Sequence, residues 1–315
     1  MTNALLFPGQ GSQFIGMGKE AYDSFIEAKE AFQEVDDVLS QNLSNLIFNG
    51  SIEDLTKTEN TQPALMVTSI ALFRVLLKQS GKNISELANY VAGHSLGEYS
   101  ALVAANSLSL ADAAKLLRIR GNAMQDAVPK GNGGMAAIIG LTIDDVEEIT
   151  KEVSDKHNEE VQIANDNSPG QVVISGSAKA IDLAEEISKL KGAKKYVVLN
   201  VSAPFHSSLM KPATKIMKDA FDEVNFNTPS IPLIANVTAK EILDPQIIKN
   251  NLVEQVAGRV RWTETVQNLA ENNITSTIEV GAGKVLSGLT KRIDRSIKPV
   301  SLQTPTDIDN YLESL

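Results

Sequence analysis

The sequence predicts an α/β protein in which a small domain is inserted into a larger one. Short apolar runs of strand length alternate with helix-length amphipathic segments along most of the chain. Residues 134–200 follow the order strand, helix, strand, strand, helix, strand, which is the ferredoxin-like order. The length of 315 residues suffices for one or two domains. We therefore expect a large domain at 1–129 and 201–315 and a small domain at 130–200.

Local signals set the first elements of the large domain. Pro63 in the first turn and Gly81 just past the end bound a largely buried helix. Ser109 starts another helix with Asp112 as a capping acid, and Pro129 helps to end it. The expected elements are a strand at 4–7, a turn at 8–12, a helix at 20–39, a helix at 62–79, a strand at 90–92, a helix at 98–105 and a helix at 109–127.

The small domain and the rest of the large domain follow from the same patterns. In the small domain we expect strands at 135–141, 161–164, 171–175 and 195–200, helices at 143–157 and 177–190, and a turn at 165–170. The large domain then resumes with strands at 231–236 and 276–280 and helices at 253–272 and 284–292.

Composition excludes several classes of function. The net charge of −10 argues against general nucleic-acid binding, which relies on neutralising phosphates. The absence of cysteine excludes disulfides, thiolate catalysis and cysteine metal sites. The first residues lack the basic segment of a signal peptide, and the apolar stretch at 64–77 contains Arg74 and is too short to span a bilayer. We expect a cytoplasmic protein that binds neither membrane nor nucleic acid.

The pentapeptide Gly-His-Ser-Leu-Gly at 93–97 joins the strand at 90–92 to the helix that follows. A Gly-x-Ser-x-Gly turn between a strand and a helix is typical of a nucleophile elbow, which lifts the serine hydroxyl to the tip of the turn. Ser95 is therefore a candidate nucleophile, and the free backbone N–H of Leu96 could donate to an oxyanion. The alternative is a structural turn with a capping serine.

A nucleophilic serine needs a base, and the chain has three histidines. His157 lies in a polar helix end, where we expect it to be exposed. His94 is adjacent to Ser95, so its side chain should point away from the tip and pack structurally. His206 follows the strand at 195–200 in a proline-containing loop, where α/β folds keep catalytic groups. By elimination, His206 is the candidate base.

Helical geometry separates two arginines of the helix that begins at Ser109. At about 100° per residue, Arg120 falls at the edge of the apolar stripe and Arg118 on the polar side. We expect Arg118 to be solvated and Arg120 to be buried beside an anion. That anion is either an internal carboxylate or the carboxylate of a substrate.

Nucleotide and metal motifs are incomplete or absent. The turn at 9–11 lacks the third glycine of a dinucleotide-binding motif because Phe14 stands there, and residues 281–284 are also incomplete. No metal-ligand spacing occurs, so we expect no metal. Five basic residues form either a solvated face or a docking patch for an anionic ligand or acidic partner. They are Lys284, Lys291, Arg292, Arg295 and Lys298.

Six segments, in order over nearly the whole chain, carry a resemblance to a known family. They are Phe-Pro-Gly-Gln-Gly-Ser-Gln at 7–13, Gly-His-Ser-Leu-Gly-Glu-Tyr at 93–99, Arg-Gly-Asn-Ala-Met-Gln at 120–125, Asn-Ser-Pro-Gly-Gln-Val-Val-Ile-Ser-Gly at 167–176, Pro-Phe-His-Ser at 204–207 and Glu-Val-Gly-Ala-Gly-Lys-Val-Leu at 279–286. With them the chain resembles the malonyl-CoA:acyl-carrier-protein transacylases of fatty-acid synthesis.

The resemblance implies a hydrolase-like large domain with a parallel sheet core and a ferredoxin-like small domain. It implies ping-pong transfer of malonyl from malonyl-CoA to the phosphopantetheine thiol of acyl carrier protein, without a tightly bound cofactor. Carried over by motif, Ser95 is the nucleophile and His206 its base. The backbone N–H groups of Leu96 and Gln10 form the oxyanion hole, and Arg120 binds the malonyl carboxylate.

Further positions follow from the resemblance. Gln255 matches a position whose backbone carbonyl orients the histidine in place of the acid of a triad. Asn165 lines the cleft from the small domain, and the aromatic ring of Phe205 leaves little room for a branched acyl group. The basic residues at 284–298 become a docking patch for an acidic carrier protein. We expect a monomer.

Three alternatives remain open from the sequence. A discrete acyltransferase of polyketide synthesis would share all these motifs. A serine thioesterase would share the serine and its base, but water would then attack the acyl-enzyme. A non-catalytic module that binds carrier protein would not need Ser95, His206 and Arg120 together.

Overall fold

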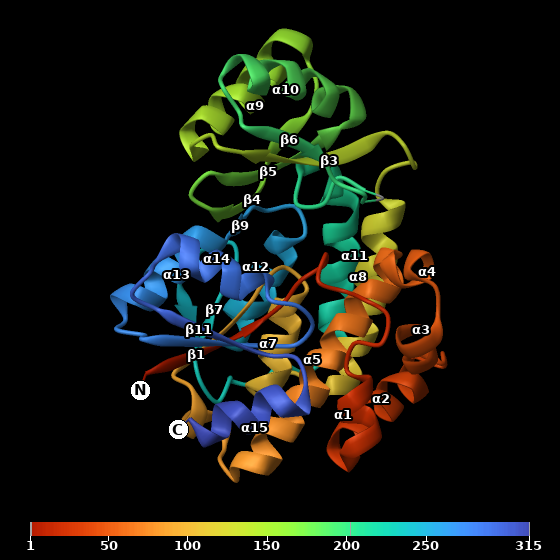
Figure 1. The fold of residues 1–315 in the computed structure, drawn as a ribbon. Coiled ribbons are helices and arrows are strands. Elements are labelled where there is room, and N and C mark those ends of the chain that lie inside the picture. Colours follow the sequence, from red (N-terminus) through yellow and green to blue (C-terminus); the bar gives the residue numbers. More distant parts are fainter. Residues whose placement is uncertain (1, 202, 315) are drawn as a thin grey trace.

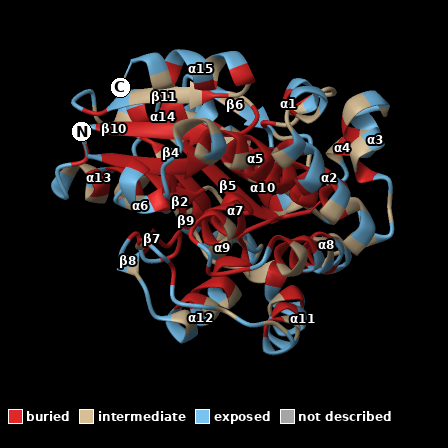
Figure 2. Cartoon of the chain, turned by 90° about the horizontal axis from the view of Figure 1, so that it is seen from below, coloured by how far each residue is buried: buried red, intermediate tan, exposed pale blue. Residues whose placement is uncertain are grey.

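The computed structural model describes residues 2–201 and 203–314. Two sheets form its framework, with the smaller sheet and its two helices at the top of the view in Figure 1. Figure 2 shows the buried strands at the centre of the molecule, enclosed by helices whose outer faces are exposed. Within residues 2–201 and 203–314, no helix has both the length and the apolar character that a membrane crossing requires.

The larger sheet has the strand order β11-β10-β1-β2-β7-β8. All neighbouring pairs are parallel except β7 with β8, which confirms the parallel core expected for the large domain. The strands are β1 (Asn3–Phe7), β2 (Tyr90–Gly93), β7 (Leu233–Ile234), β8 (Glu241–Ile242), β10 (Ser276–Val280) and β11 (Lys298–Leu302).

Helices cover both faces of this sheet because its strands are apolar on both sides. Leu5 and Phe7 of β1 pack into the core on one face, whereas Ala4 and Leu6 pack into the core on the other. The helices of this part are α1 (Lys19–Ser24), α2 (Ile26–Leu39), α3 (Leu43–Asn49), α4 (Ile52–Thr56), α5 (Thr58–Ser80), α6 (Ile84–Leu87), α7 (Gly97–Ala104), α8 (Leu110–Asp126), the 3-10 turn η1 (Ser208–Met210), α11 (Lys211–Asp222), α12 (Pro245–Gln255), α13 (Trp262–Glu271), α14 (Val285–Ile293) and α15 (Pro305–Glu313).

The smaller sheet has the order β6-β3-β5-β4-β9. Its first four strands are antiparallel neighbours with α9 and α10 packed on one face, so the ferredoxin-like arrangement is confirmed. The chain segments are β3 (Gly133–Ile139), α9 (Ile143–His157), β4 (Val161–Ser168), β5 (Gln171–Ser177), α10 (Ala178–Leu190) and β6 (Lys195–Val198). An unexpected fifth strand, β9 (Val260–Arg261), joins the sheet parallel to β4.

Helix ends follow the local signals. Ser109 caps α8 by accepting the backbone N–H of Asp112, and Gly81 ends α5 in the left-handed conformation at φ 65°. Pro63 lies near the start of α5, which begins at Thr58 rather than at residue 62. The capping and stop signals were therefore more accurate than the expected start of the buried helix.

Three expectations about continuity were wrong. The helix expected at 20–39 is two helices, because Phe25 is extended at φ −128° and ψ 129°. The helix expected at 253–272 is interrupted, because the chain leaves α12 after Gln255 and forms β9 before α13. The turn expected at 165–170 is mostly strand, since β4 pairs with β5 as far as Ser168 through two irregularities in register.

Candidate active site

The turn after β2 holds Ser95 in a strained conformation at φ 53°. Its flanking glycines permit the tight packing. A Cβ on Gly93 would lie 1.9 Å from the carbonyl carbon of Gly97, and one on Gly97 would lie 2.3 Å from the carbonyl oxygen of Phe7. The strand, turn and helix predicted for an elbow are therefore present, with α7 beginning at Gly97.

His206 lies against this serine. Its Nε2 is 2.7 Å from Ser95 Oγ, and its Nδ1 lies 2.8 Å from the carbonyl oxygen of Gln255 and 3.1 Å from that of Gly258. Because carbonyl oxygens only accept, Nδ1 carries the proton and Nε2 is left to accept one from the serine. Burial, and next the charge of Arg120, lower the pKa of His206 to about 3, so the imidazole is neutral near pH 7.

The exposure of His157 is as expected, whereas His94 packs structurally but does not lie wholly away from the site. His157 is exposed at the end of α9. His94 packs its ring 5.4 Å from that of Trp262, and its Nε2 lies 2.8 Å from Asn167 Oδ1. His94 also lines the cavity above the serine, and within the described chain it forms no hydrogen bond with Ser95 Oγ or His206.

Arg120 is buried at 2% exposure and points to the serine from α8. Its Nη2 donates to Ser95 Oγ at 3.1 Å and to Gln255 Oε1 at 3.0 Å, and its Nη1 donates to Gln62 Oε1 at 2.6 Å. Its buried Nε has no partner, and no carboxylate of residues 2–201 and 203–314 forms an ion pair with it. Of the two anions considered for Arg120, an internal carboxylate in direct contact is therefore ruled out within the described chain.

Arg118 differs from the prediction. It is half-buried rather than solvated, and its guanidinium donates to Asn60 Oδ1 at 3.0 Å and to Gln41 Oε1. The arginine lies on the side expected from helical geometry, but α2 and α5 pack against α8 and cover it. The position on the helix was predictable, whereas the neighbouring helices were not.

A cavity of about 300 Å³ opens over the serine and the histidine. Besides these two it is lined by five of the residues singled out from the sequence, namely Gln10, Leu96, Arg120, Asn165 and Phe205. Neither the backbone N–H of Gln10 nor that of Leu96 has an acceptor among residues 2–201 and 203–314. Gln255 is fully buried and lies behind the serine instead of on the cavity wall.

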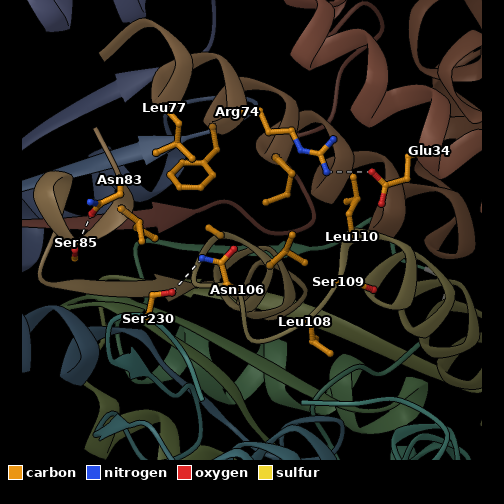
Figure 3. A pocket seen from close by; sticks show the side chains of 15 residues that line it. Glu34, Arg74, Leu77, Asn83, Ser85, Asn106, Leu108, Ser109, Leu110 and Ser230 are labelled. Atoms are coloured by element: carbon orange, nitrogen blue, oxygen red, sulfur yellow. Dashed lines mark hydrogen bonds and ion pairs between the residues drawn. The ribbon is translucent and has the colours of Figure 1, made fainter. Parts of the chain in front are cut away.

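A larger cavity of about 670 Å³ lies elsewhere, between α5, α6 and the start of α8 (Figure 3). Its charged lining residues, Glu34 and Arg74, pair with each other at 3.0 Å, and Asn106 donates to Ser230 Oγ at 3.0 Å. None of the candidate catalytic residues lines it. Size alone therefore selects a cavity without the candidate residues, whereas the meeting of the candidate nucleophile, the candidate base and a buried cation selects the smaller one.

The five basic residues near the C-terminus are all exposed, on α14, its flanks and β11. None of them forms an ion pair with the rest of the described chain, although Arg292 donates to Gln171 Oε1 at 2.6 Å. None of them lines the cavity over Ser95. They form an uncompensated basic surface outside the cleft.

Sequence reasoning missed Asn236, Glu98 and Gln62, and it gave Gln255 a role for its backbone carbonyl but none for its side chain. Asn236 Oδ1 accepts the backbone N–H of Ser95 at 2.7 Å, and Gln255 Nε2 donates to the carbonyl oxygen of Ser95 at 3.0 Å. Glu98 accepts from both Asn236 and Gln255. Glu98 stands in the first turn after the elbow, and Gln62 is a polar residue in a largely apolar helix. A polar residue at a position expected to be buried is the sequence signal that could have identified both.

Comparisons with known proteins identify the family of this chain. The sequence model of the acyl transferase domain family matches residues 4–304. The malonyl CoA-acyl carrier protein transacylase of Bacillus subtilis is 47% identical over 312 residues, which cover 99% of this chain and 96% of that protein. The transacylase of the same name from Escherichia coli K12 is 42% identical over 98% of both chains.

Solved structures extend the similarity to the whole fold. The acyl-carrier-protein S-malonyltransferase of Bartonella henselae has a TM-score of 0.96 and 52% identity, covering 100% of this chain and 99% of its own. A malonyl-transacylase in complex with its type II PKS acyl-carrier protein has a TM-score of 0.96 and 39% identity over 100% of both chains. With a family model that matches almost its whole length and relatives that align from end to end, this chain belongs to the acyl transferase domain family.

Proposed function

We propose that this chain transfers the malonyl group from malonyl-CoA to the phosphopantetheine thiol of acyl carrier protein, supplying extender units for fatty-acid synthesis. One observation carries the proposal. Ser95 Oγ lies 2.7 Å from a histidine nitrogen and 3.1 Å from the guanidinium of a buried arginine. The first contact suits acyl transfer through a serine ester, and the second suits an acyl group that ends in a carboxylate.

In the first half-reaction, His206 Nε2 takes the proton of Ser95 Oγ while that oxygen attacks the thioester carbonyl. The N–H groups of Leu96 and Gln10 stabilise the resulting oxyanion. The carbon–sulfur bond then breaks, the thiolate of CoA leaves, and the proton on His206 passes to it. Malonyl-Ser95 remains.

In the second half-reaction, the thiol of the carrier protein gives its proton to His206 and attacks the ester carbonyl of malonyl-Ser95. The intermediate collapses by breaking the bond to Ser95 Oγ, which recovers the proton from His206. One thioester is consumed and one is formed, so neither a metal nor a redox cofactor is required. Since the two donors use one site in turn, the kinetics are ping-pong.

Arg120 is proposed to bind the free carboxylate of the malonyl group. Gln62 and Gln255 hold the guanidinium in place, and we propose that Nε, which has no partner among residues 2–201 and 203–314, is a further donor for the substrate. Asn165 and Phe205 complete the walls of the cavity, and the aromatic ring of Phe205 restricts branched acyl groups. The carbonyl oxygens of Gln255 and Gly258 take the place of the acid of a triad.

We further propose that the exposed basic residues Lys284, Lys291, Arg292, Arg295 and Lys298 dock an acidic carrier protein. The proposed large domain comprises residues 1–129 and 201–315, and the proposed small domain comprises residues 130–200. This division fits the two sheets except for β9, which belongs to the large domain in sequence but pairs with the smaller sheet. We expect the protein to act as a cytoplasmic monomer.

Intact-mass analysis tests the proposal directly. The protein is mixed briefly with malonyl-CoA, first alone and then with carrier protein that bears phosphopantetheine from either fatty-acid or polyketide synthesis. A single malonyl adduct that is absent from Ser95→Ala and moves to the carrier thiol supports the proposal. An adduct lost only to water identifies a thioesterase, and no adduct at all refutes the acyl-enzyme.

A further inference from the structure

A carboxylate is buried beneath the nucleophile turn. Glu98, in the first turn of α7, is 1% exposed. No ion pair joins it to a lysine or arginine of residues 2–201 and 203–314. Its Oε2 accepts the backbone N–H of Asn236 at 3.1 Å and Nε2 of Gln255 at 2.8 Å. Burying an acid without a cation in contact is costly, so the position calls for an explanation other than stability.

The two partners of Glu98 hold the reacting groups. Asn236 accepts the N–H of Ser95 at 2.7 Å and donates to the carbonyl oxygen of Gly93 at 2.7 Å. Gln255 donates to the carbonyl oxygen of Ser95 at 3.0 Å and accepts from Arg120 at 3.0 Å. Both peptide groups of the strained Ser95 are therefore held by the side chains of two residues that bond to this one carboxylate oxygen, Gln255 through its side-chain amide and Asn236 through its backbone N–H.

The carboxylate, together with the guanidinium of Arg120 and the carbonyl oxygen of Ser95, fixes which way the Gln255 amide faces. An ionised carboxylate only accepts, so the NH₂ group of Gln255 must face Glu98 and its Oε1 must face Arg120. If the amide turned over, its NH₂ would oppose the guanidinium, which only donates. Arg120 would lose an acceptor, and Ser95 would lose a donor to its carbonyl oxygen.

We propose that Glu98 is a positioning residue for acyl transfer, acting through the side-chain amide of Gln255 on Arg120 and on the Ser95 turn. The inference rests on the proposed function, because it assigns Glu98 a part in aligning the arginine that would bind the malonyl carboxylate. Acetyl-CoA has no such carboxylate, so the alignment of Arg120 matters for malonyl and not for acetyl. The ratio of malonyl to acetyl transfer to Ser95 is therefore the informative quantity.

The test compares Glu98→Gln with the wild type by the rate of Ser95 acylation from malonyl-CoA and from acetyl-CoA. The assay is run at about pH 8, where the wild-type carboxyl is ionised although burial raises its pKa to about 7. An amide at residue 98 can present an NH₂ group in place of the charged acceptor, so the Gln255 amide is then held only by its bonds to Arg120 and to the carbonyl oxygen of Ser95. The ratio of malonyl to acetyl acylation is expected to fall about 10- to 100-fold, the range for a lost bond to a charged group.

Glu279→Gln is the matched control. Glu279 is also 1% exposed, but its carboxylate accepts the N–H groups of Leu286 at 3.0 Å and Ser287 at 2.7 Å at the start of α14. This variant should lower the melting temperature and leave the ratio unchanged. A similar fall in the ratio for Glu279→Gln would mean that loss of any buried carboxylate disturbs the site, and would overturn the proposal.

A double-mutant cycle with Gln255→Ala separates positioning from a merely structural role. Gln255→Ala removes the amide and keeps the backbone carbonyl that faces His206. In that background Glu98→Gln should change the ratio less than twofold, whereas additive effects would overturn the proposal. If Glu98→Gln does not fold, Glu98→Asp replaces it, because the shorter side chain withdraws the carboxylate from Gln255. A wild-type ratio of malonyl to acetyl acylation in Glu98→Asp would refute the proposal. Failure of the proposed function can be told apart from failure of the Glu98 proposal, because in the former case the wild-type protein itself would form no malonyl adduct.

Discussion

Replacing Arg120 with alanine should change which acyl group the protein transfers. The guanidinium is buried and donates to Ser95 Oγ, and its Nε has no partner within the described part of the chain, so a malonyl carboxylate would meet charged donors shielded from water. Each bond between charged groups contributes about 1.5 to 3 kcal/mol. Two such bonds at the lower value give about 3 kcal/mol, which corresponds to about a 150-fold loss in kcat/KM for malonyl-CoA.

Acetyl transfer provides the comparison within the same variant. An acetyl group makes no bond to Arg120, and removal of the guanidinium takes a buried charge away from the pocket. Acylation by acetyl-CoA should therefore stay within a few-fold of wild type or increase. The measurement is the acylation rate of Ser95 from each thioester by rapid quench and intact mass.

Arg118→Ala is the matched control on the same helix. Arg118 is half-buried and bonds Asn60 and Gln41, so its loss should lower stability as well. It does not line the cavity over Ser95, and the selectivity should remain that of the wild type. If Arg120→Ala keeps the wild-type ratio of malonyl to acetyl acylation, whether or not both rates fall, the carboxylate-binding role is refuted.

Three further predictions concern pH, docking and the turn. Burial raises the pKa of Glu98 from 4.5 to about 7, so the folded protein retains a proton that the unfolded chain releases. As the pH rises from about 4.5 to about 7, this group therefore lowers the free energy of unfolding by roughly 3 kcal/mol. Urea unfolding of Glu98→Gln at a series of pH values should lack this decrease. If the free energy of unfolding of variant and wild type changes with pH in parallel, the prediction is contradicted. Lys291→Glu combined with Arg295→Glu should raise the KM for carrier protein several-fold, more at low salt, and leave acylation by malonyl-CoA unchanged. Equal effects on both half-reactions would exclude the docking patch. Gly93→Ala should abolish acylation, because its Cβ would lie 1.9 Å from Gly97, and a variant with normal acylation would show that the turn can widen.

The sequence was informative where a side chain or a turn signal dictates geometry. The glycine spacing at 93–97 predicted the elbow, the helical stripe predicted the burial of Arg120, and alternation of elements predicted both sheets. His206 could be selected because the other histidines lay in positions unsuited to a base. These inferences use local patterns, which one sequence contains.

Backbone acceptors and helix breaks were not predictable in the same way. The carbonyl oxygens of Gln255 and Gly258 look like those of any residue, and their direction depends on where α12 ends. The apolar pattern at 253–272 continues through this point, but pairing of β9 with β4 interrupts the helix. Likewise, no glycine or proline marks Phe25, where α1 and α2 separate. At β9 a distant contact outweighed the local preference.

The pairing of β9 with β4 has a mechanical consequence. Asn165 on β4 opposes Val260 on β9, and Asn165 also lines the cavity. The carbonyl groups that hold His206 stand just upstream on the same strip of chain, at Gln255 and Gly258. If the smaller sheet rotated with the β4–β9 pairing intact, it would also move the carbonyl groups that hold the imidazole of His206. Any such opening of the cleft would therefore also change the position of His206 relative to Ser95.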